Sequence, residues 1–187
     1  GGKNMFVAHG MEDLDLYLSR GLPLDRDHRL LVDKFLEDAF EYDLDALSDG
    51  RNVYVAGILE HIEAAGIHSG DSTCVFPAYK CTPELYREMS SAAVKIARET
   101  GVVGFLNIQF AAKNGELYIL EVNPRASRTV PFLSKASGVN LVKAAVRLWE
   151  GESLESQGLT KDGYGEGRCL TEWAVKEAVF SFDRFSS

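Results

Sequence analysis

Apolar residues recur at helical spacing in three stretches of this 187-residue chain, and these stretches predict helices over residues 12–20, 83–100 and 141–149. The longest has Thr82 as a plausible N-cap, Pro83 at its first helical position and Gly101 at its end. Asn140 and Gly151 bracket the last helix in the same way.

Elsewhere the apolar runs are short or alternate with polar residues, which predicts strands. The expected strands cover residues 5–8, 30–36, 42–47, 53–59, 74–76, 105–111, 117–122 and 173–180. Asp49-Gly50 and Asn114-Gly115 mark two hairpin turns, while residues 60–73 are expected to form a loop and 152–168 an exposed connection. Strands in hairpins, interrupted by helices, indicate an α+β or mixed α/β fold.

The hairpin around Asn114-Gly115 makes a sharper prediction. Its apolar residues fall at even positions, namely Leu106, Ile108, Phe110, Tyr118, Leu120 and Val122. A plain two-residue turn pairs positions whose numbers sum to an odd value and would split this set across both faces. We therefore expect an odd loop length or a bulge, with Gly115 at positive φ. Gln109, Glu121 and Asn123 then share the opposite, polar face.

A carboxylate with two amide oxygens is a set that suits Mg²⁺ or Mn²⁺ and is poor for zinc. An ordinary half-exposed strand pair with polar outer residues would show the same pattern. Arg125 and Arg128 follow directly, and their guanidinium groups suit capture of phosphate or carboxylate oxygens. A solvated loop with surface ion pairs is the alternative for these arginines. Together the two motifs favour a metal–nucleotide site with an anion clamp.

Composition narrows the function classes. A net charge of -8 argues against binding nucleic acid by counterion release or holding an anionic membrane surface. No apolar run approaches the ~18–20 residues that span a bilayer. Three cysteines without a Cys-x-x-Cys pair suggest neither a disulfide framework nor a zinc site, so a cytoplasmic location fits best. The polar run 60–72 contains two histidines, without the spacing of a helical zinc site.

Several long motifs resemble the carbamoyl-phosphate synthase large chain. They are residues 34–39, 60–72, 121–132, 134–138 and 175–180, so the resemblance covers nearly the whole sequence. That family's large chain contains two homologous ATP-grasp halves. The loop Glu60-His61-Ile62-Glu63 and the run Thr129-Val130-Pro131-Phe132 are similar to the C-terminal half, which uses ATP to phosphorylate carbamate.

The resemblance implies a role for each candidate residue. Around the adenine and ribose it places Lys34, Leu36 and Glu41. Along the nucleotide it places Gly66, Ile67, His68 and Ser69, with His68 near the phosphates. For the divalent metals, Mg²⁺ or Mn²⁺, it implies Gln109, Glu121 and Asn123. For carbamate and the transferred phosphoryl group it implies Arg125 and Arg128. For a monovalent cation, K⁺ in particular, it implies Glu41, His61, Glu63 and Ser72.

The same resemblance implies an ATP-grasp fold of the α+β class, with mixed or antiparallel sheets and packed helices. Residues 1–151 would form a partial ATP-grasp domain, with 1–36 as a small lid-like portion and 37–151 as the large subdomain. Residues 152–187 would add a connection and a strand. On this resemblance we expect the chain to be a fragment that lacks the family's preceding nucleotide-fold subdomain. The expected partners are ATP, carbamate, the remainder of the large chain and a glutaminase small subunit.

Three other interpretations stay open at the level of sequence. Another ATP-grasp carboxylate–amine ligase or carboxylase would share the metal-binding set. A nucleotide-binding module without activity of its own would share it too. Exposed apolar patches near residues 5–8 and 30–36 would also suit an interaction surface.

Overall fold

The computed structural model describes residues 6–19, 30–63, 71–159 and 172–179, and the chain divides into two units, residues 1–37 and 38–187. In the first unit, α1 (Met11–Ser19) confirms the first predicted helix, and Phe6 stacks on Tyr17 with ring centroids 4.4 Å apart. Residues 6–8 and 30–36 form no strand there, so those two predictions are wrong. Leu31 and Phe35 are exposed, as expected for an apolar run without a sheet to join.

The second unit is built on one antiparallel sheet in the order β5-β4-β1-β2-β3-β6. Its strands are β1 (Phe40–Asp49), β2 (Val53–His61), β3 (Cys74–Phe76), β4 (Val103–Lys113), β5 (Glu116–Asn123) and β6 (Ala174–Lys176). The predicted last strand is therefore cut to three residues, and Glu60 and His61 continue β2 instead of starting a loop.

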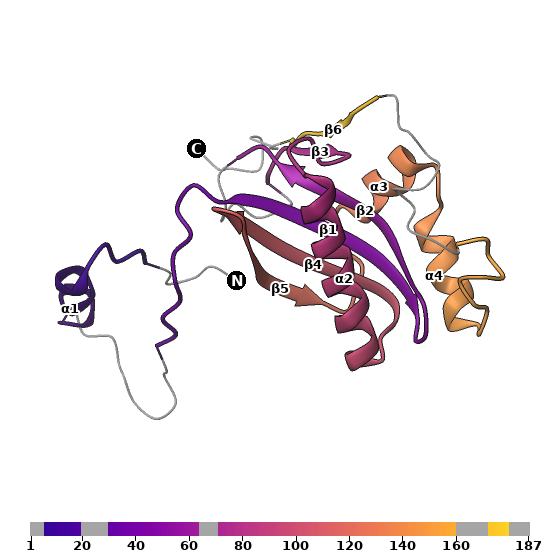
Figure 1. Cartoon of the computed structure of the whole chain (residues 1–187), viewed down its shortest axis with the longest axis horizontal. Coiled ribbons are helices and arrows are strands. Elements are labelled where there is room, and N and C mark those ends of the chain that lie inside the picture. The colour runs from indigo at the N-terminus through magenta and orange to yellow at the C-terminus, as the bar shows by residue number, and fades with distance from the viewer. Residues whose placement is uncertain (1–5, 20–29, 64–70, 160–171, 180–187) are drawn as a thin grey trace, which may run out of the picture. The chain divides into compact units, whose positions relative to one another are not determined.

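Helix α2 (Pro83–Thr100) lies across one face of the sheet (Figure 1). Its start follows the prediction, because the Thr82 side chain accepts a hydrogen bond from the Leu85 amide at 3.2 Å, and Gly101 closes it in the left-handed conformation. Even-numbered apolar residues of β1 and β4 pack beneath it in one cluster, which includes Tyr42, Leu44, Ala46, Leu106, Ile108 and Phe110 together with Met89, Ala93 and Ala97 of α2.

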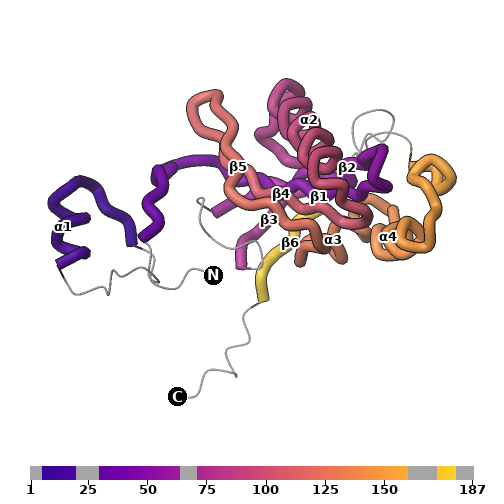
Figure 2. The backbone as a smooth tube through the Cα atoms, turned by 90° about the horizontal axis from the view of Figure 1, so that it is seen from below, coloured from indigo at the N-terminus to yellow at the C-terminus, as the bar shows by residue number. Residues whose placement is uncertain are grey.

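The opposite face carries α3 (Val130–Ser137) and α4 (Leu141–Trp149) (Figure 2). A second cluster forms there from Leu47, Tyr54, Leu59 and Phe105 of the sheet with Leu133, Leu141 and Leu148 of the helices. Helix α3 was not predicted, although Thr129, Pro131 and Gly138 are start and stop signals. Leu154 joins this cluster and is 1% exposed, so the connection that follows α4 is not exposed throughout.

The β4–β5 hairpin bears out the predicted bulge but not its place. Asn114 and Gly115 form a plain two-residue turn, with φ of 53° and 81°. From the turn to the pair of Phe110 and Ile119, the numbers of paired residues sum to an odd value. Beyond that pair the register shifts by one residue, so that Gln109 faces Glu121. Leu120 is the extra residue of this bulge, which lies four residues from the turn.

The predicted core residues of β5 are partly wrong. Opposed residues share a face, so Leu117, Ile119 and Val122 lie on the α2 side, whereas Tyr118 lies with Ala111 on the other side. Ile119, Leu120 and Val122 are also 50%, 46% and 37% exposed. The physical reason is that β5 is an edge strand, and the described residues of this unit do not cover it along its length.

Candidate active site

Polar side chains gather on the face of the sheet that also carries α3 and α4. Pairing places them in two rows across β1, β4 and β5: Asp43, Gln109 and Glu121 in one, and Asp45, Asn107 and Asn123 in the other. Burial falls from the middle of the sheet outward: Asp43 and Asp45 are 1% and 2% exposed, whereas Glu121 at the edge is exposed. The bulge makes the rows possible, because it returns Glu121 and Asn123 to the polar face.

The structure thus places Gln109, Glu121 and Asn123 on one face, as the register argument predicted. Their carbonyl and carboxylate oxygens are the donor type that Mg²⁺ and Mn²⁺ take. Among the described residues there is no group of three or more His, Cys, Asp or Glu that could hold a metal ion. This set has one carboxylate and two amides, so it fits a hard cation that retains water or phosphate oxygens as further ligands.

The two arginines lie on the loop that connects β5 to α3. Arg125 donates from Nη2 to Asn123 Oδ1 at 3.2 Å and from Nη1 to the Ala126 carbonyl at 3.0 Å. Arg128 is exposed, whereas Thr129, the N-cap residue of α3, is fully buried. Two guanidinium groups therefore follow the oxygen-rich rows within five residues, next to the edge at which Glu121 is open to solvent.

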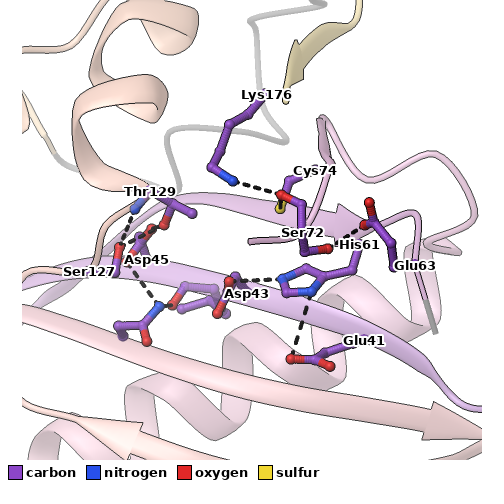
Figure 3. Close-up of polar contacts among 12 residues, drawn as sticks. Glu41, Asp43, Asp45, His61, Glu63, Ser72, Cys74, Ser127, Thr129 and Lys176 are labelled. Carbon is purple, nitrogen blue, oxygen red and sulfur yellow. Dashed lines mark hydrogen bonds and ion pairs between the residues drawn. The ribbon is translucent and has the colours of Figure 1, made fainter. Parts of the chain in front are cut away.

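Asp45 connects several of these groups (Figure 3). Its Oδ2 accepts from the Thr129 hydroxyl at 2.5 Å and its Oδ1 from Asn107 Nδ2 at 3.1 Å. Asn107 Oδ1 in turn accepts from Asn123 Nδ2 at 3.4 Å, and Thr129 shares a hydrogen bond of 2.6 Å with Ser127. Burial raises the pKa of Asp45 to about 6, against the lowering effect of hydrogen bonds from Thr129 and Ser127.

A second buried cluster surrounds His61 on β2 (Figure 3). Its Nε2 lies 2.9 Å from Asp43 Oδ2, and its Nδ1 lies 3.8 Å from Glu41 Oε1. Burial lowers the pKa of His61, but hydrogen bonding and charge interaction with Asp43 and Cys74 outweigh that effect and raise it to about 10. The structure thus brings two residues of the predicted K⁺ set, Glu41 and His61, together beside Asp43.

Glu63 and Ser72, the other two residues of the predicted K⁺ set, contact each other. Ser72 Oγ donates to Glu63 Oε2 at 2.5 Å, and the Thr73 amide donates to the same oxygen at 2.7 Å. The Ser72 hydrogen bond is the main reason why the pKa of Glu63 is lowered to about 2. Lys176 of β6 donates to the Ser72 carbonyl at 2.7 Å. The carboxylate and hydroxyl oxygens of this pair are suitable donors for a monovalent cation.

The remaining predicted residues lie apart from these clusters or outside the described ranges. Gly66, Ile67, His68 and Ser69 fall outside the described residues. Lys34 and Leu36 belong to the first unit, where Lys34 is exposed and Leu36 half-buried. The roles that the resemblance implies for all six stay predictions.

Sequence reasoning missed Asp43 and Asp45, and it assigned no role to Asn107. A signal was available, because Glu41, Asp43 and Asp45 alternate with apolar residues in a strand whose even face is core. Three acidic residues on one face of a central strand are seldom buried without a specific reason.

Comparison with known proteins identifies the family. Residues 1–157 match the family model described as "Carbamoyl-phosphate synthase L chain, ATP binding domain". The carbamoyl phosphate synthase large chains of Vibrio vulnificus and Micrococcus luteus are 46% and 47% identical to this chain over 185 and 190 residues. Each alignment covers 99% of this chain and 17% of the relative, so the chain spans about one sixth of those proteins.

Solved structures confirm the fold class. The biotin carboxylase domain of a single-chain bacterial carboxylase superposes with a TM-score of 0.66 at 22% identity, covering 76% of this chain and 33% of that one. A long-chain acyl-CoA carboxylase gives a TM-score of 0.60, also at 22% identity, covering 77% of this chain and 14% of that one. The predicted α+β, ATP-grasp fold is therefore correct. No helix within the described ranges is long and apolar enough to span a membrane.

Proposed function

Because the chain belongs to the family of carbamoyl-phosphate synthase large-chain ATP-binding domains, we propose that it carries the site at which ATP phosphorylates carbamate to carbamoyl phosphate. In that reaction a carbamate oxygen forms a bond to the γ-phosphorus while the bond to the ADP oxygen breaks. The observation that carries the proposal is the bulged pairing that sets Gln109, Glu121 and Asn123 on one face beside two arginines.

Gln109, Glu121 and Asn123 are the residues that would hold Mg²⁺ or Mn²⁺. When bound, such an ion neutralises charge on the β- and γ-phosphates. The Asn123 amide nitrogen donates to Asn107, and its oxygen accepts one hydrogen bond from Arg125, so a second lone pair of that oxygen remains for a cation. Glu121 supplies the carboxylate and is open to solvent, where a phosphate-bound ion can reach it.

Arg125 and Arg128 bind the oxygens of carbamate and of the phosphoryl group in this proposal. Neither is buried, so each can turn toward an anion without breaking a packed core. A charge-assisted hydrogen bond of this kind contributes about 1.5–3 kcal/mol. The contact is of greatest use where charge develops during transfer, so these residues affect turnover more than nucleotide binding.

The remaining roles complete the proposal. Lys34, Leu36, Glu41 and the segment 66–69 contact the nucleotide, with His68 near its phosphates. Glu41, His61, Glu63 and Ser72 bind K⁺, and two pairs within this set already lie close together, His61 with Glu41 and Ser72 with Glu63. Residues 1–36 form a small lid-like portion, residues 37–151 form the large subdomain, and residues 152–187 add a connection and a strand.

We further propose that the working enzyme includes the remainder of the large chain and a glutaminase subunit, and that it acts in the cytoplasm. The test is carbamate-dependent formation of ADP and carbamoyl phosphate by the full-length gene product, followed by ³¹P NMR. Turnover that needs a different carboxylate would indicate another ATP-grasp ligase. Nucleotide binding without turnover would indicate a binding module.

A further inference from the structure

The two ends of the arginine-bearing loop are hydrogen-bonded, directly or through one side chain, to the same buried carboxylate. At its end, Thr129 donates to one oxygen of Asp45. At its start, Asn123 donates to Asn107, and Asn107 donates to the other oxygen of Asp45. The loop from Asn123 to Thr129 therefore closes on a single residue of the central strand β1.

Stability of the fold alone does not explain a carboxylate at position 45. Asp45 is 2% exposed, and within the described ranges no lysine, arginine or histidine forms an ion pair with it. Burying a carboxylate without a cation is costly, and an apolar residue would serve a plain core position better. A carboxylate does offer two acceptor oxygens in a fixed plane, which can hold two separate donors at a set distance.

We propose that Asp45 is a positioning residue that fixes the metal-binding amide of Asn123 and the two arginines relative to each other. The inference rests on the proposed function, because it gives Asn123, Arg125 and Arg128 their roles. It adds a residue that touches neither metal nor substrate and acts through Asn107 and Thr129. Groups in this position, one shell behind the ligands, typically change activity about 10- to 100-fold when removed.

A matched pair of substitutions on one strand separates positioning from stability. Asp45→Asn keeps the shape but leaves one oxygen for two donors, and it removes the buried charge. Asp49→Asn makes the same chemical change four residues along, where Asp49 accepts from the amides of Arg51, Asn52 and Leu154, far from the loop. We expect Asp45→Asn to lower kcat about 10- to 100-fold with little change in melting temperature or in KM for nucleotide. We expect Asp49→Asn to lower the melting temperature and to leave kcat and KM nearly unchanged.

Thr129 supplies a second pair in case Asp45→Asn fails to fold. Thr129→Val removes the hydroxyl at nearly constant volume, whereas Thr129→Ser retains it and should restore kcat to within about twofold of the parent. All four variants are made in the full-length protein. The rate measured is ATP formation from MgADP and carbamoyl phosphate, the reverse of the proposed reaction.

Hydrogen–deuterium exchange across residues 123–129 provides a readout that does not depend on activity. Faster exchange there in Asp45→Asn and Thr129→Val, but not in Asp49→Asn or Thr129→Ser, supports the inference. Unchanged exchange in both of the first two variants overturns it, whatever the rates. If the parent protein forms no ATP, the proposed function fails, and exchange alone then decides the role of Asp45.

Discussion

The bulge in β5 can be tested by comparing two single-residue deletions, one of Leu120 and one of Val122. Leu120 has no partner in β4, so its deletion joins Ile119 to Glu121 and leaves Gln109 opposite Glu121. The strand then alternates regularly, with both Glu121 and Asn123 still on the polar face. Deleting Val122 shortens the strand equally, but it forces either Glu121 or Asn123 into the place opposite Ile108, on the α2 side of the sheet.

The magnitudes follow from exposure and from the contacts at stake. Leu120 is 46% exposed, so its removal forfeits about 1 kcal/mol of apolar burial. One added ladder hydrogen bond returns a comparable amount, about 0.5–1.5 kcal/mol. Loss of one oxygen ligand by the Val122 deletion removes an interaction worth about 1.5–3 kcal/mol, or about 10- to 100-fold in affinity.

The assay is a titration with a fluorescent ADP analogue in excess Mg²⁺ and again in EDTA, and the quantity compared is the gain in affinity that Mg²⁺ produces. The Leu120 deletion should keep that gain within about threefold of the parent, and the Val122 deletion should abolish most of it. Val122→Ala is the control for loss of the side chain. Equal behaviour of the two deletions, both cooperatively folded, would refute the reasoning from register.

Three further predictions concern stability and turnover. Gly104 has φ +103° and an added Cβ would lie 2.5 Å from Trp149 Nε1, so Gly104→Ala should lower the free energy of unfolding, measured by chemical denaturation, by about 2–5 kcal/mol. In a Trp149→Ala background only the backbone strain of about 1–3 kcal/mol should remain. An undiminished loss there would show that the contact with Trp149 is irrelevant. His61 stabilises the fold fully below about pH 6.5, because its pKa is raised to about 10 when folded. The difference in unfolding free energy between the parent and His61→Gln should therefore be about 3–5 kcal/mol at pH 6 and shrink as the pH rises toward 10, and a gap that widens would contradict the pairing with Asp43. Arg128→Ala should lower kcat about 10- to 100-fold while Kd for MgADP changes less than threefold, and an equal loss in both would place Arg128 on the nucleotide instead.

Local signals in the sequence predicted those elements that local chemistry determines. Thr82, Pro83 and Gly101 bound the longest helix because they satisfy its ends directly. The bulge near Leu120 followed from a conflict between a two-residue turn and an alternating pattern, which lies within one hairpin. The same reasoning misplaced Tyr118, since the position of a bulge depends on what covers each face and not on the turn.

Features that depend on distant residues were missed. The hydrogen bond between Asp45 and Thr129 joins positions 84 residues apart, and no local sequence signal near either residue predicts it. The apolar run that includes Leu31 was predicted as a strand, yet a strand needs a neighbour, which the described part of its unit does not offer it. The contact of 2.9 Å between His61 and Asp43 joins two neighbouring strands, and the sequence pattern did not predict it.

The most direct test of the metal assignment is the NMR spectrum of the side-chain amides in the presence of MnADP. Paramagnetic Mn²⁺ broadens the signals of nearby groups steeply with distance. The account predicts that the amide signals of Gln109 and Asn123 disappear at substoichiometric MnADP, while that of Asn140, which caps α4, persists. Persistence of the Gln109 and Asn123 signals at saturating MnADP, or their loss only together with that of Asn140, would contradict the claim that these residues hold the metal.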